Sequence, residues 1–393
     1  MSSSKPRIYL DNAATTALLP GVQKKITEVM AQFGNPSSLH EHGRNAKHLI
    51  DWAREKVAGA FGCLFAEVVF TGSGTEAANL AIIGAALANE YPTRNKVLMS
   101  AIEHHCVLNT RPLLERLGYT VALIPVNQES FLDVDALEKM VDETVLLVSV
   151  MSVNNETGSI QPTEKIVEIA HRNGAKYHCD HTQGFLKQGL FQALPNPVAL
   201  GADLVSVAAH KINGPKGVGA LAVLNGTKIK PLLNGGEQER EMRGGTENIL
   251  GIVGFGAAIE GHEPLNINGF QKKLMNSLSE IGALPTIGNS FSQTLESHVH
   301  VRFPGIDAET ILIRLDREGI SASSGAACSS GSIEPSHVML ACGYSEEEAK
   351  EGLRFSFGYG NTMEQAEQAS EIIVNVVTEI QERRGVTVTP LNS

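Results

Sequence analysis

Between about Glu67 and Leu224, short apolar runs alternate with stretches of helical spacing. The run Val145–Met151 is apolar at almost every position, which is typical of a strand buried on both faces of a parallel sheet. Helices are predicted over Ala77–Leu87 and from Pro162 to Asn173. The predicted strands are Glu67–Phe70, Lys96–Ser100, Thr120–Val126, Val145–Met151, Ala175–Cys179, Asp203–Val207 and Gly217–Leu224. Such alternation predicts an α/β architecture, a mostly parallel sheet with helices on both faces.

The pattern changes near residues 261–268, and a second unit is expected beyond them. Its predicted strands are Ser297–Phe303 and Leu353–Phe357, and its predicted helices are Ala308–Arg317 and a long one ending near Arg383. Two helix starts carry capping-box residues, at Ser345 with Glu348 and at Thr362 with Gln365. We expect a large domain over 21–262 and a smaller α+β C-terminal domain over 263–393. Residues 1–20 are expected to pack with the small domain.

Composition narrows the function classes. The net charge is −11 and the chain has no basic block, so direct nucleic-acid binding is not expected. No apolar run reaches the ~18 residues of a membrane helix, and the first residues lack a secretory signal, so we expect a cytoplasmic protein. The five cysteines are odd in number and scattered, which favours a working thiol over a disulfide framework.

Polar residues follow several predicted strands, and in an open α/β sheet ligands bind at that edge. The segment Thr71-Gly-Ser-Gly-Thr75 joins a strand to a helix. Its glycines and the helix N-terminus suit a phosphate, although a plain tight turn has the same composition. It is not a Walker loop, because no Gly-Lys-Ser/Thr follows.

Two histidine-containing segments, Glu103–Cys106 and His178–His181, raise the possibility of a zinc site. Alternation along the second segment sends His178 and Asp180 to one face and Cys179 to the other, and neither segment has metal-ligand spacing. We therefore predict no metal. Asp180, a carboxylate at a strand end, needs a cationic or hydrogen-bonding partner.

Two other residue types suit covalent chemistry. Lys211 directly follows a buried strand, where loss of water favours a neutral, nucleophilic amine. Lys216 lies in a Gly-Pro turn and is the weaker candidate. Cys328 lies in Ser321–Ser332, a loop of small residues too polar for a core, so its thiol is expected to be accessible. The other four cysteines, in apolar or structured contexts, are expected to serve as packing residues.

Together these motifs resemble the cysteine desulfurases of the NifS/IscS type, in the class V aminotransferase group of pyridoxal-phosphate enzymes. The resemblance covers nearly the whole chain. It rests on the segments Tyr9–Thr16, Gly34–Ser38, Thr71–Asn79, Glu103–His104, Asn154–Gly158, Asp180–Gln183, His210–Gly217, Arg243–Asn248, Ser324–Cys328, Glu334–Pro335 and Leu353–Ser356. The resemblance implies a fold-type I pyridoxal-phosphate transferase that converts L-cysteine to L-alanine and leaves a persulfide on Cys328.

The resemblance also assigns roles residue by residue. Lys211 would hold pyridoxal phosphate as an internal aldimine, Asp180 would pair with the ring nitrogen, and His104 would stack on the ring and act in acid–base chemistry. Asn155 and Gln183 would lie near the ring hydroxyl, Asn155 also near the substrate, and Arg354 would bind the substrate carboxylate. The phosphate would be held by Gly74, Thr75 and His210, with Thr246 contributed by the second subunit of a homodimer.

One position departs from the family pattern. Many relatives carry Ser or Thr three residues before the lysine, and here that residue is Ala208. Either Ser206, on the same strand face, replaces this phosphate donor, or the donor is missing. The segment around Cys328 matches the long-loop branch of the family.

Two alternatives stay open. One is another class V aminotransferase or β-lyase, because a fold does not fix a function; the other is a non-catalytic homologue that docks partners. The sulfur acceptor is not specified by the sequence. Iron–sulfur scaffolds, tRNA thiolation and DNA phosphorothioation are the candidate destinations.

Overall fold

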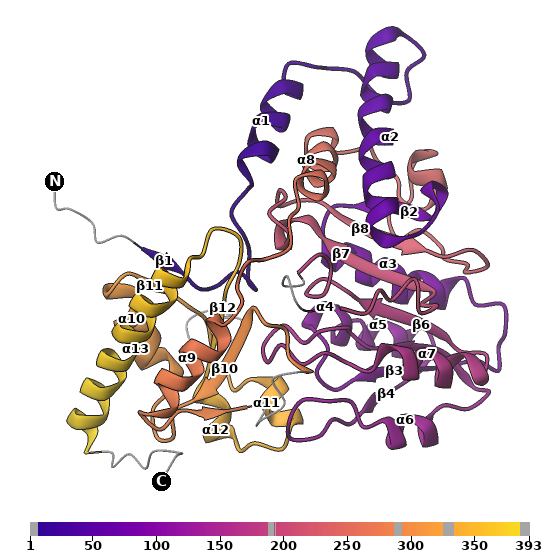
Figure 1. Ribbon diagram of the computed structural model, residues 1–393. Coiled ribbons are helices and arrows are strands. Elements are labelled where there is room, and N and C mark those ends of the chain that lie inside the picture. The colour runs from indigo at the N-terminus through magenta and orange to yellow at the C-terminus, as the bar shows by residue number, and fades with distance from the viewer. Residues whose placement is uncertain (1–6, 188–191, 193, 287–292, 325–333, 386–393) are drawn as a thin grey trace.

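The computed structural model describes residues 7–187, 192, 194–286, 293–324 and 334–385, and the fold is an α/β unit joined to a smaller α+β unit (Figure 1). The large sheet has seven strands in the order β2-β8-β7-β6-β5-β3-β4. These are β2 (Val68–Thr71), β3 (Lys96–Ser100), β4 (Thr120–Ile124), β5 (Val145–Ser149), β6 (Lys176–Asp180), β7 (Leu204–Ala208) and β8 (Gly219–Val223). Only β8, among the strands described here, runs antiparallel to its neighbours β2 and β7. The predicted α/β fold with a mostly parallel sheet is therefore confirmed.

Helices cover both faces of this sheet, as the continuous apolar runs require (Figure 1). One face packs on α3 (Gly74–Leu87), which contributes Leu80 and Ile82 to a core shared with Val97 and Leu147. The other face packs on α2 (Glu41–Phe61), α7 (Thr163–Arg172) and α8 (Ile249–Glu260). The other helices of this unit are α1 (Pro20–Val29), α4 (His105–Leu108), α5 (Arg111–Arg116) and α6 (Val134–Met140).

The smaller unit has its own apolar core. Its sheet has the order β12-β10-β9, with β9 (Leu284–Pro285), β10 (His298–Arg302) and β12 (Gly352–Ser356). Its helices are α9 (Phe270–Ser279), α10 (Ala308–Arg317), α11 (His337–Ala341), α12 (Glu346–Lys350) and α13 (Met363–Arg384). The predicted capping boxes of α12 and α13 are both present, each worth ~1 kcal/mol of helix stability.

The N-terminal segment contacts both units. Strand β1 (Ile8–Tyr9) pairs with β11 (Ile320–Ser321) in a parallel two-stranded sheet. Further along, Thr16 and Leu19 donate backbone N–H groups to the carbonyl oxygens of His210 and Asn213. The segment therefore crosses from the smaller unit to the end of β7.

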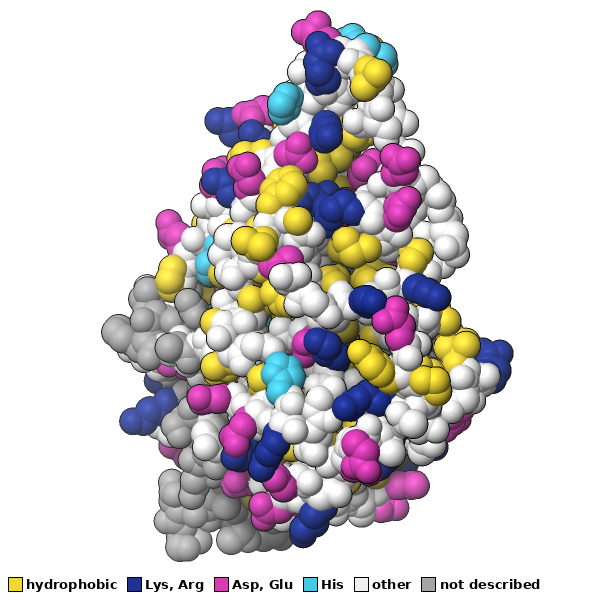
Figure 2. All heavy atoms as spheres, turned by 90° about the vertical axis from the view of Figure 1, so that its right-hand side faces the viewer, with side chains coloured by type: hydrophobic (Ala, Val, Ile, Leu, Met, Phe, Trp, Pro, Cys, Tyr) yellow, Lys and Arg dark blue, Asp and Glu magenta, His cyan; other side chains and the backbone are white. Residues whose placement is uncertain are grey.

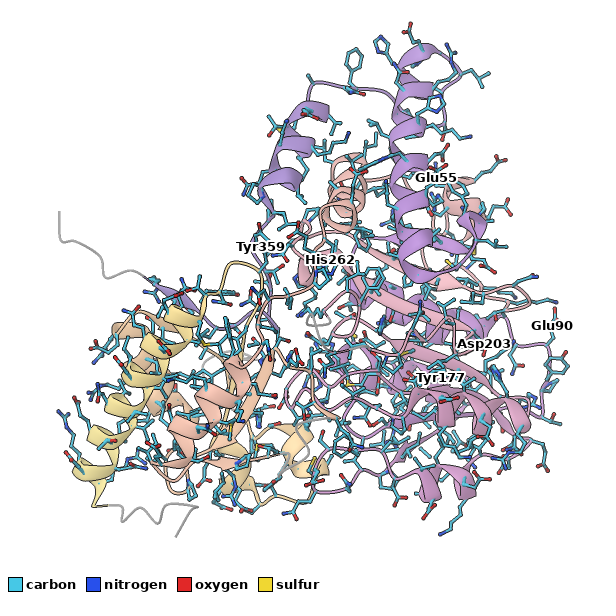
Figure 3. All side chains as sticks on the ribbon, in the orientation of Figure 1. Glu55, Glu90, Tyr177, Asp203, His262 and Tyr359 are labelled. Atoms are coloured by element: carbon cyan, nitrogen blue, oxygen red, sulfur yellow. The ribbon has the colours of Figure 1, made fainter. Side chains whose placement is uncertain are left out.

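Side chains of both units also meet around a narrow cavity that His262 and Tyr359 line (Figure 3). On the face of the molecule shown in Figure 2, basic and acidic side chains are interspersed over the described residues. No helix among the described residues has the length and apolar character needed to cross a membrane.

Candidate active site

A cavity of about 390 Å³ lies at the carboxyl ends of the parallel strands, as the position of ligand sites in α/β sheets predicts. Segments that follow β2, β3, β5, β6 and β7 form its wall, and Ala13, Ala14, Ser323 and Arg354 close it from the other side. Nine of the residues expected to form the site line it: Gly74, Thr75, His104, Asn155, Asp180, Gln183, His210, Lys211 and Arg354.

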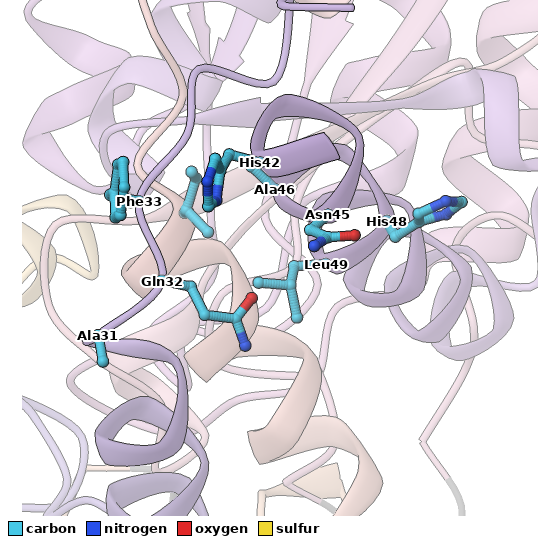
Figure 4. Close-up of a pocket in the computed structure, with 9 residues that line it drawn as sticks. Ala31, Gln32, Phe33, His42, Asn45, Ala46, His48 and Leu49 are labelled. Atoms are coloured by element: carbon cyan, nitrogen blue, oxygen red, sulfur yellow. The ribbon is translucent and has the colours of Figure 1, made fainter. Parts of the chain in front are cut away.

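A second cavity, of about 540 Å³, lies at the tip formed by α1 and α2 (Figure 4). Phe33 and His42 stack there with ring centroids 4.7 Å apart. None of the residues expected to form the site lines this cavity. The cavity at the carboxyl ends of the strands is therefore the candidate active site.

Lys211 lies in a single 3₁₀ turn, Ala209–Lys211, immediately after β7. Its Nζ donates to the carbonyl oxygens of Ala13 and Ala14, at 2.6 and 2.8 Å. Burial, together with the charge of Arg354, lowers the pKa of Lys211 to about 8. The amine is thus half neutral near pH 8, as a nucleophilic lysine needs. Lys216 is exposed and does not line the cavity.

Asp180 ends β6 and is 7% exposed. Its Oδ1 accepts the backbone N–H of Thr182 at 3.0 Å, and its Oδ2 lies 3.9 Å from the Cys106 Sγ. The carboxylate therefore faces the cavity without an ion pair among the described residues, and it can receive a cationic ligand group there.

The start of α3 forms an anion site. The N-cap Ser73 accepts the N–H of Glu76 through its side chain at 3.1 Å. The N–H groups of Gly74 and Thr75, which have no acceptor inside the helix, are left for a ligand. Gly74 suits this close packing, because a Cβ on it would lie 3.0 Å from the Ala208 Cβ, closer than most Cβ contacts in proteins.

Arg354 on β12 is 4% exposed and joins the two units. Its Nη1 donates to the Asn155 carbonyl oxygen at 2.7 Å and its Nη2 to Asp11 Oδ1 at 2.8 Å. Its Nε and the Asn155 Oδ1 are buried and have no hydrogen-bond partner among the residues that the structure describes. Buried polar groups are rarely left unpaired, so these two atoms mark a place for a polar ligand group.

Two histidines of the cavity are held neutral. Burial lowers the pKa of His104, and its Nδ1 accepts the Cys106 N–H at 3.1 Å, so the ring proton lies on Nε2. Burial, with the charge of Lys211, lowers the pKa of His210 to about 4. His210 Nδ1 lies 3.1 Å from the Thr15 hydroxyl.

Two expectations are wrong. Ser206 does not replace the phosphate donor missing at Ala208, because its hydroxyl lies 3.0 Å from His178 Nε2, is fully buried and does not line the cavity. Cys106 is not a buried packing residue, because it is partly exposed and lines the cavity. Cys63 is also only partly buried, whereas Cys179 and Cys342 are buried as expected.

The structure adds two residues that the sequence did not single out, Asp11 and Lys187. Asp11 pairs with Arg354 across 343 positions of the chain. Lys187 is buried and donates to Gln183 Oε1 at 2.7 Å. Asp11 lies within the motif Tyr9–Thr16, which could have pointed to it. No sequence pattern points to Lys187. Among the described residues, no group of three or more His, Cys, Asp or Glu is arranged to hold a metal ion.

Thr246 is exposed and lies outside the cavity, in a loop next to a strained segment. Glu239, Arg240 and Glu241 all adopt left-handed backbone, with φ of 47°, 57° and 64°. A buried ion pair between Glu239 and Arg54, at 2.6 Å, holds this segment. Each such residue costs ~1–3 kcal/mol, so the loop is fixed at an energetic cost typical of functional segments. Cys328 lies outside the described residues.

Comparisons with known proteins identify the family of the chain. The model of the family "Aminotransferase class-V" matches residues 8–368. The chain belongs to the class-V aminotransferase family. "Cysteine desulfurase IscS" of Methanosarcina thermophila is 39% identical, over 97% of this chain and 94% of its own length.

Two solved structures share the fold of this class-V chain. A structure titled "NIFS-LIKE PROTEIN" has a TM-score of 0.85 at 32% identity and covers 95% of this chain and 100% of its own. The structure titled "SspA in complex with cysteine" has a TM-score of 0.78 at 32% identity and covers 89% of this chain and 98% of its own.

Enzymes of this class-V group work with pyridoxal phosphate, and so does this one. The cavity fits the cofactor by its own chemistry. The helix N-terminus at Gly74 suits a phosphate, Asp180 suits a ring nitrogen that carries a proton, and the Lys211 amine suits an aldehyde. The unpaired Asn155 Oδ1 and Arg354 Nε leave polar positions for the group or its substrate.

Cys106 is expected to resist alkylation although it lines the cavity. Burial and the charges of Asp180 and Glu103 raise the pKa of its thiol, and each unit of such a rise removes about nine-tenths of the reactive thiolate. Iodoacetamide at pH 8 should label Cys106 at least ~100-fold more slowly in the folded protein than in urea, as peptide mass spectrometry can measure. Equal rates would show that Asp180 does not hold the thiol protonated.

Proposed function

We propose that the protein is a cysteine desulfurase, which removes the sulfur of L-cysteine, releases L-alanine and leaves a persulfide on Cys328. The observation that carries this proposal is one cavity that holds the Lys211 amine, the Asp180 carboxylate and Arg354, with Ser323 in its wall. Ser323 precedes Cys328 by five residues, and an extended chain of that length reaches at most ~18 Å. The names of the relatives, cysteine desulfurase and a cysteine complex, support the same activity.

The contacts of the site residues support a role for each of them. When bound, pyridoxal phosphate supplies an aldehyde that bonds to amines and a ring that withdraws electrons from the substrate α-carbon. Lys211 would hold the group, and its amine, when free, would take the α-proton of the substrate. Asp180 would keep a proton on the ring nitrogen. Gly74, Thr75 and His210 would bind the phosphate.

Substrate binding falls to Arg354 and Asn155. The Nε–H of Arg354 would donate to the substrate carboxylate, while Nη1 and Nη2 stay on Asn155 and Asp11. A charge-assisted hydrogen bond of this kind orients the amino acid as well as holding it. His104, with its proton on Nε2, lies on the same cavity wall and can donate a hydrogen bond from Nε2 to the substrate.

The sulfur step balances without an added oxidant. The thiolate of Cys328 attacks the substrate sulfur and an S–S bond forms. The C–S bond breaks, and its electron pair stays on the β-carbon, which takes a proton and leaves as part of alanine. Cys328 keeps the transferred sulfur as a persulfide, from which an acceptor protein takes it. The acceptor belongs to iron–sulfur assembly, tRNA thiolation or DNA phosphorothioation.

We further propose a homodimer in which Thr246 reaches the phosphate site of the partner. Thr246 is exposed and its loop adjoins the segment fixed by the buried Arg54–Glu239 pair. A loop held in this way can present a hydroxyl to a second subunit without first being ordered, which lowers the entropic cost of association. Two-fold symmetry would complete both sites at once.

The decisive experiment follows sulfur from cysteine to the protein. Mass spectrometry of the loaded enzyme after addition of cysteine should find one extra sulfur atom on the Cys328 peptide. Cys328→Ser should keep the bound cofactor but lose alanine and persulfide formation by at least ~100-fold, because a hydroxyl is a far poorer nucleophile toward sulfur. Cys342→Ser, at a buried thiol away from the cavity, is the matched control and should still form both products. A persulfide on another cysteine, or alanine formation by Cys328→Ser at the wild-type rate, would refute the proposal.

A further inference from the structure

Lys187 is a buried amine to which the proposed chemistry gives no role. It lies seven residues after the end of β6 and is 6% exposed. No ion pair with a carboxylate is found for it in the described part of the chain, and its Nζ donates to Gln183 Oε1 at 2.7 Å. A buried ammonium without a counter-charge is costly. Burial therefore lowers the pKa of Lys187 well below its usual value, and the nearby charges of Lys211 and Arg354 lower it further.

Titratable and charged groups from several elements surround Lys187. They are Lys211 and His210 after β7, Arg354 on β12, His298 on β10, Asp11 in the N-terminal segment and His262 at the shared cavity. Asp11 is the acidic member, and its Oδ1 is engaged by Arg354. In either protonation state Lys187 offers N–H groups as donors.

The hydrogen bond from Lys187 fixes how the Gln183 amide is turned. A terminal amide rotates between two orientations that exchange its oxygen and its nitrogen. Because Lys187 donates to Oε1, the Nε2 group points the other way and donates to the Ala13 carbonyl oxygen at 2.9 Å. That same carbonyl accepts from Lys211 Nζ at 2.6 Å. Four groups thus form one chain: Lys187, Gln183, Ala13 and Lys211.

We propose that Lys187 is a positioning residue that locks the Gln183 amide with its N–H group toward the cavity and thereby sets how strongly the Ala13 carbonyl holds the Lys211 amine. With the amide locked, the Ala13 oxygen shares its lone pairs between Gln183 and Lys211. With the amide free to turn, the Ala13 oxygen loses one donor and binds the lysine more strongly.

The consequence is a change in the protonation of Lys211. Stronger acceptors stabilise the ammonium over the neutral amine. Without the lock, Lys211 would hold its proton to higher pH, and fewer molecules would carry a nucleophilic amine near neutrality. The inference rests on the proposed function, because it concerns the lysine proposed to hold the cofactor. The hydrogen bonds from which it is argued are those of the cofactor-free protein.

The test measures the Lys211 amine in the full-length, cofactor-free protein, so that it does not depend on desulfurase activity. Trinitrobenzenesulfonate modifies neutral amines, and the labelled Lys211 peptide is quantified by mass spectrometry as a function of pH. The wild-type midpoint is expected near pH 8, and Lys187→Met should raise it by about 0.5–1 pH unit. Lys176→Met, at a lysine of β6 that pairs with Asp203, is the matched control and should leave the midpoint unchanged.

A double-mutant cycle separates this role from a purely structural one. Gln183→Leu should raise the midpoint by itself, and Lys187→Met should add nothing in that background, since it acts through Gln183. Because Gln183→Leu alone tests the chain of contacts, the inference stays testable even if Lys187→Met fails to fold. It is overturned if Lys187→Met, as folded by circular dichroism, or Gln183→Leu leaves the midpoint in place, or if the two shifts add.

Discussion

Replacing Lys211 with alanine should abolish the covalent attachment of pyridoxal phosphate and reduce turnover by at least ~100-fold, the lower end of the loss expected for a general base. Borohydride treatment of the wild-type enzyme should fix the cofactor to the Lys211 peptide, and the same treatment of Lys211→Ala should leave that peptide unlabelled. The reason is position: Lys211 is the amine that lines the cavity beside Asp180 and His104.

The role of Lys211 also predicts how the rate of cofactor capture changes with pH. Attachment needs the neutral amine, and the pKa of Lys211 is lowered to about 8. Capture by the cofactor-free protein should therefore accelerate up to pH 8 and level off above it, whereas a lysine with an ordinary pKa of ~10.4 would continue to accelerate. Lys216→Ala, at an exposed lysine of the same motif, is the control and should behave as the wild type. A label on Lys216 in the wild-type protein would contradict the assignment.

The second large effect is expected for Asp180→Asn. The amide oxygen can still accept the Thr182 N–H, so the end of β6 should keep its structure. The amide carries no charge, however, and cannot hold a proton on the ring nitrogen of the cofactor. We expect the variant to bind cofactor and to lose turnover by about 10²–10³-fold, a loss typical when one group that stabilises developing charge is removed.

Asp203→Asn is the matched control for that experiment. Asp203 is as buried as Asp180, at 7% exposed, but it precedes β7 at the opposite edge of the sheet and pairs with Lys176 and His171. Its replacement should lower the melting temperature and spare the turnover of the folded fraction. Near-normal turnover of Asp180→Asn at full cofactor occupancy would exclude the charge role.

The sequence predicted the parts of the site that lie within single segments. The site residues at the ends of β2, β6 and β7 directly follow apolar runs. Each run predicts a strand, and the end of the run predicts where the strand reaches the edge of the sheet. Lys211, Asp180 and Gly74 were placed in this way, and the cavity brings them together. The strand and helix boundaries moved by only a few residues; α3, for example, begins at Gly74 and not at Ala77.

Contacts between distant segments could not be predicted from such a pattern. Asp11 and Arg354 are 343 positions apart, and neither position carries a signal that names the other. Cys106 is expected to pack in the core because its segment has a structured context, but the structure turns it toward Asp180. Ser206 shares a strand face with Ala208, but that face also carries a contact to His178, which takes the hydroxyl. In each case a partner from another segment decides the outcome.

The N-terminal segment makes a contact that can form only late in the synthesis of the chain on the ribosome. The Ala13 N–H donates to the Ser356 hydroxyl at 2.8 Å, across 343 positions, and the carbonyl of the same residue holds Lys211. At a synthesis rate of ~5–20 residues per second, Ala13 exists for roughly 20–70 s before Ser356 is made. A nascent chain that already contains Lys211 therefore lacks the anchor for its carbonyl partners. Under the role proposed for Lys211, the site that captures the cofactor is complete only after the C-terminal unit has been made.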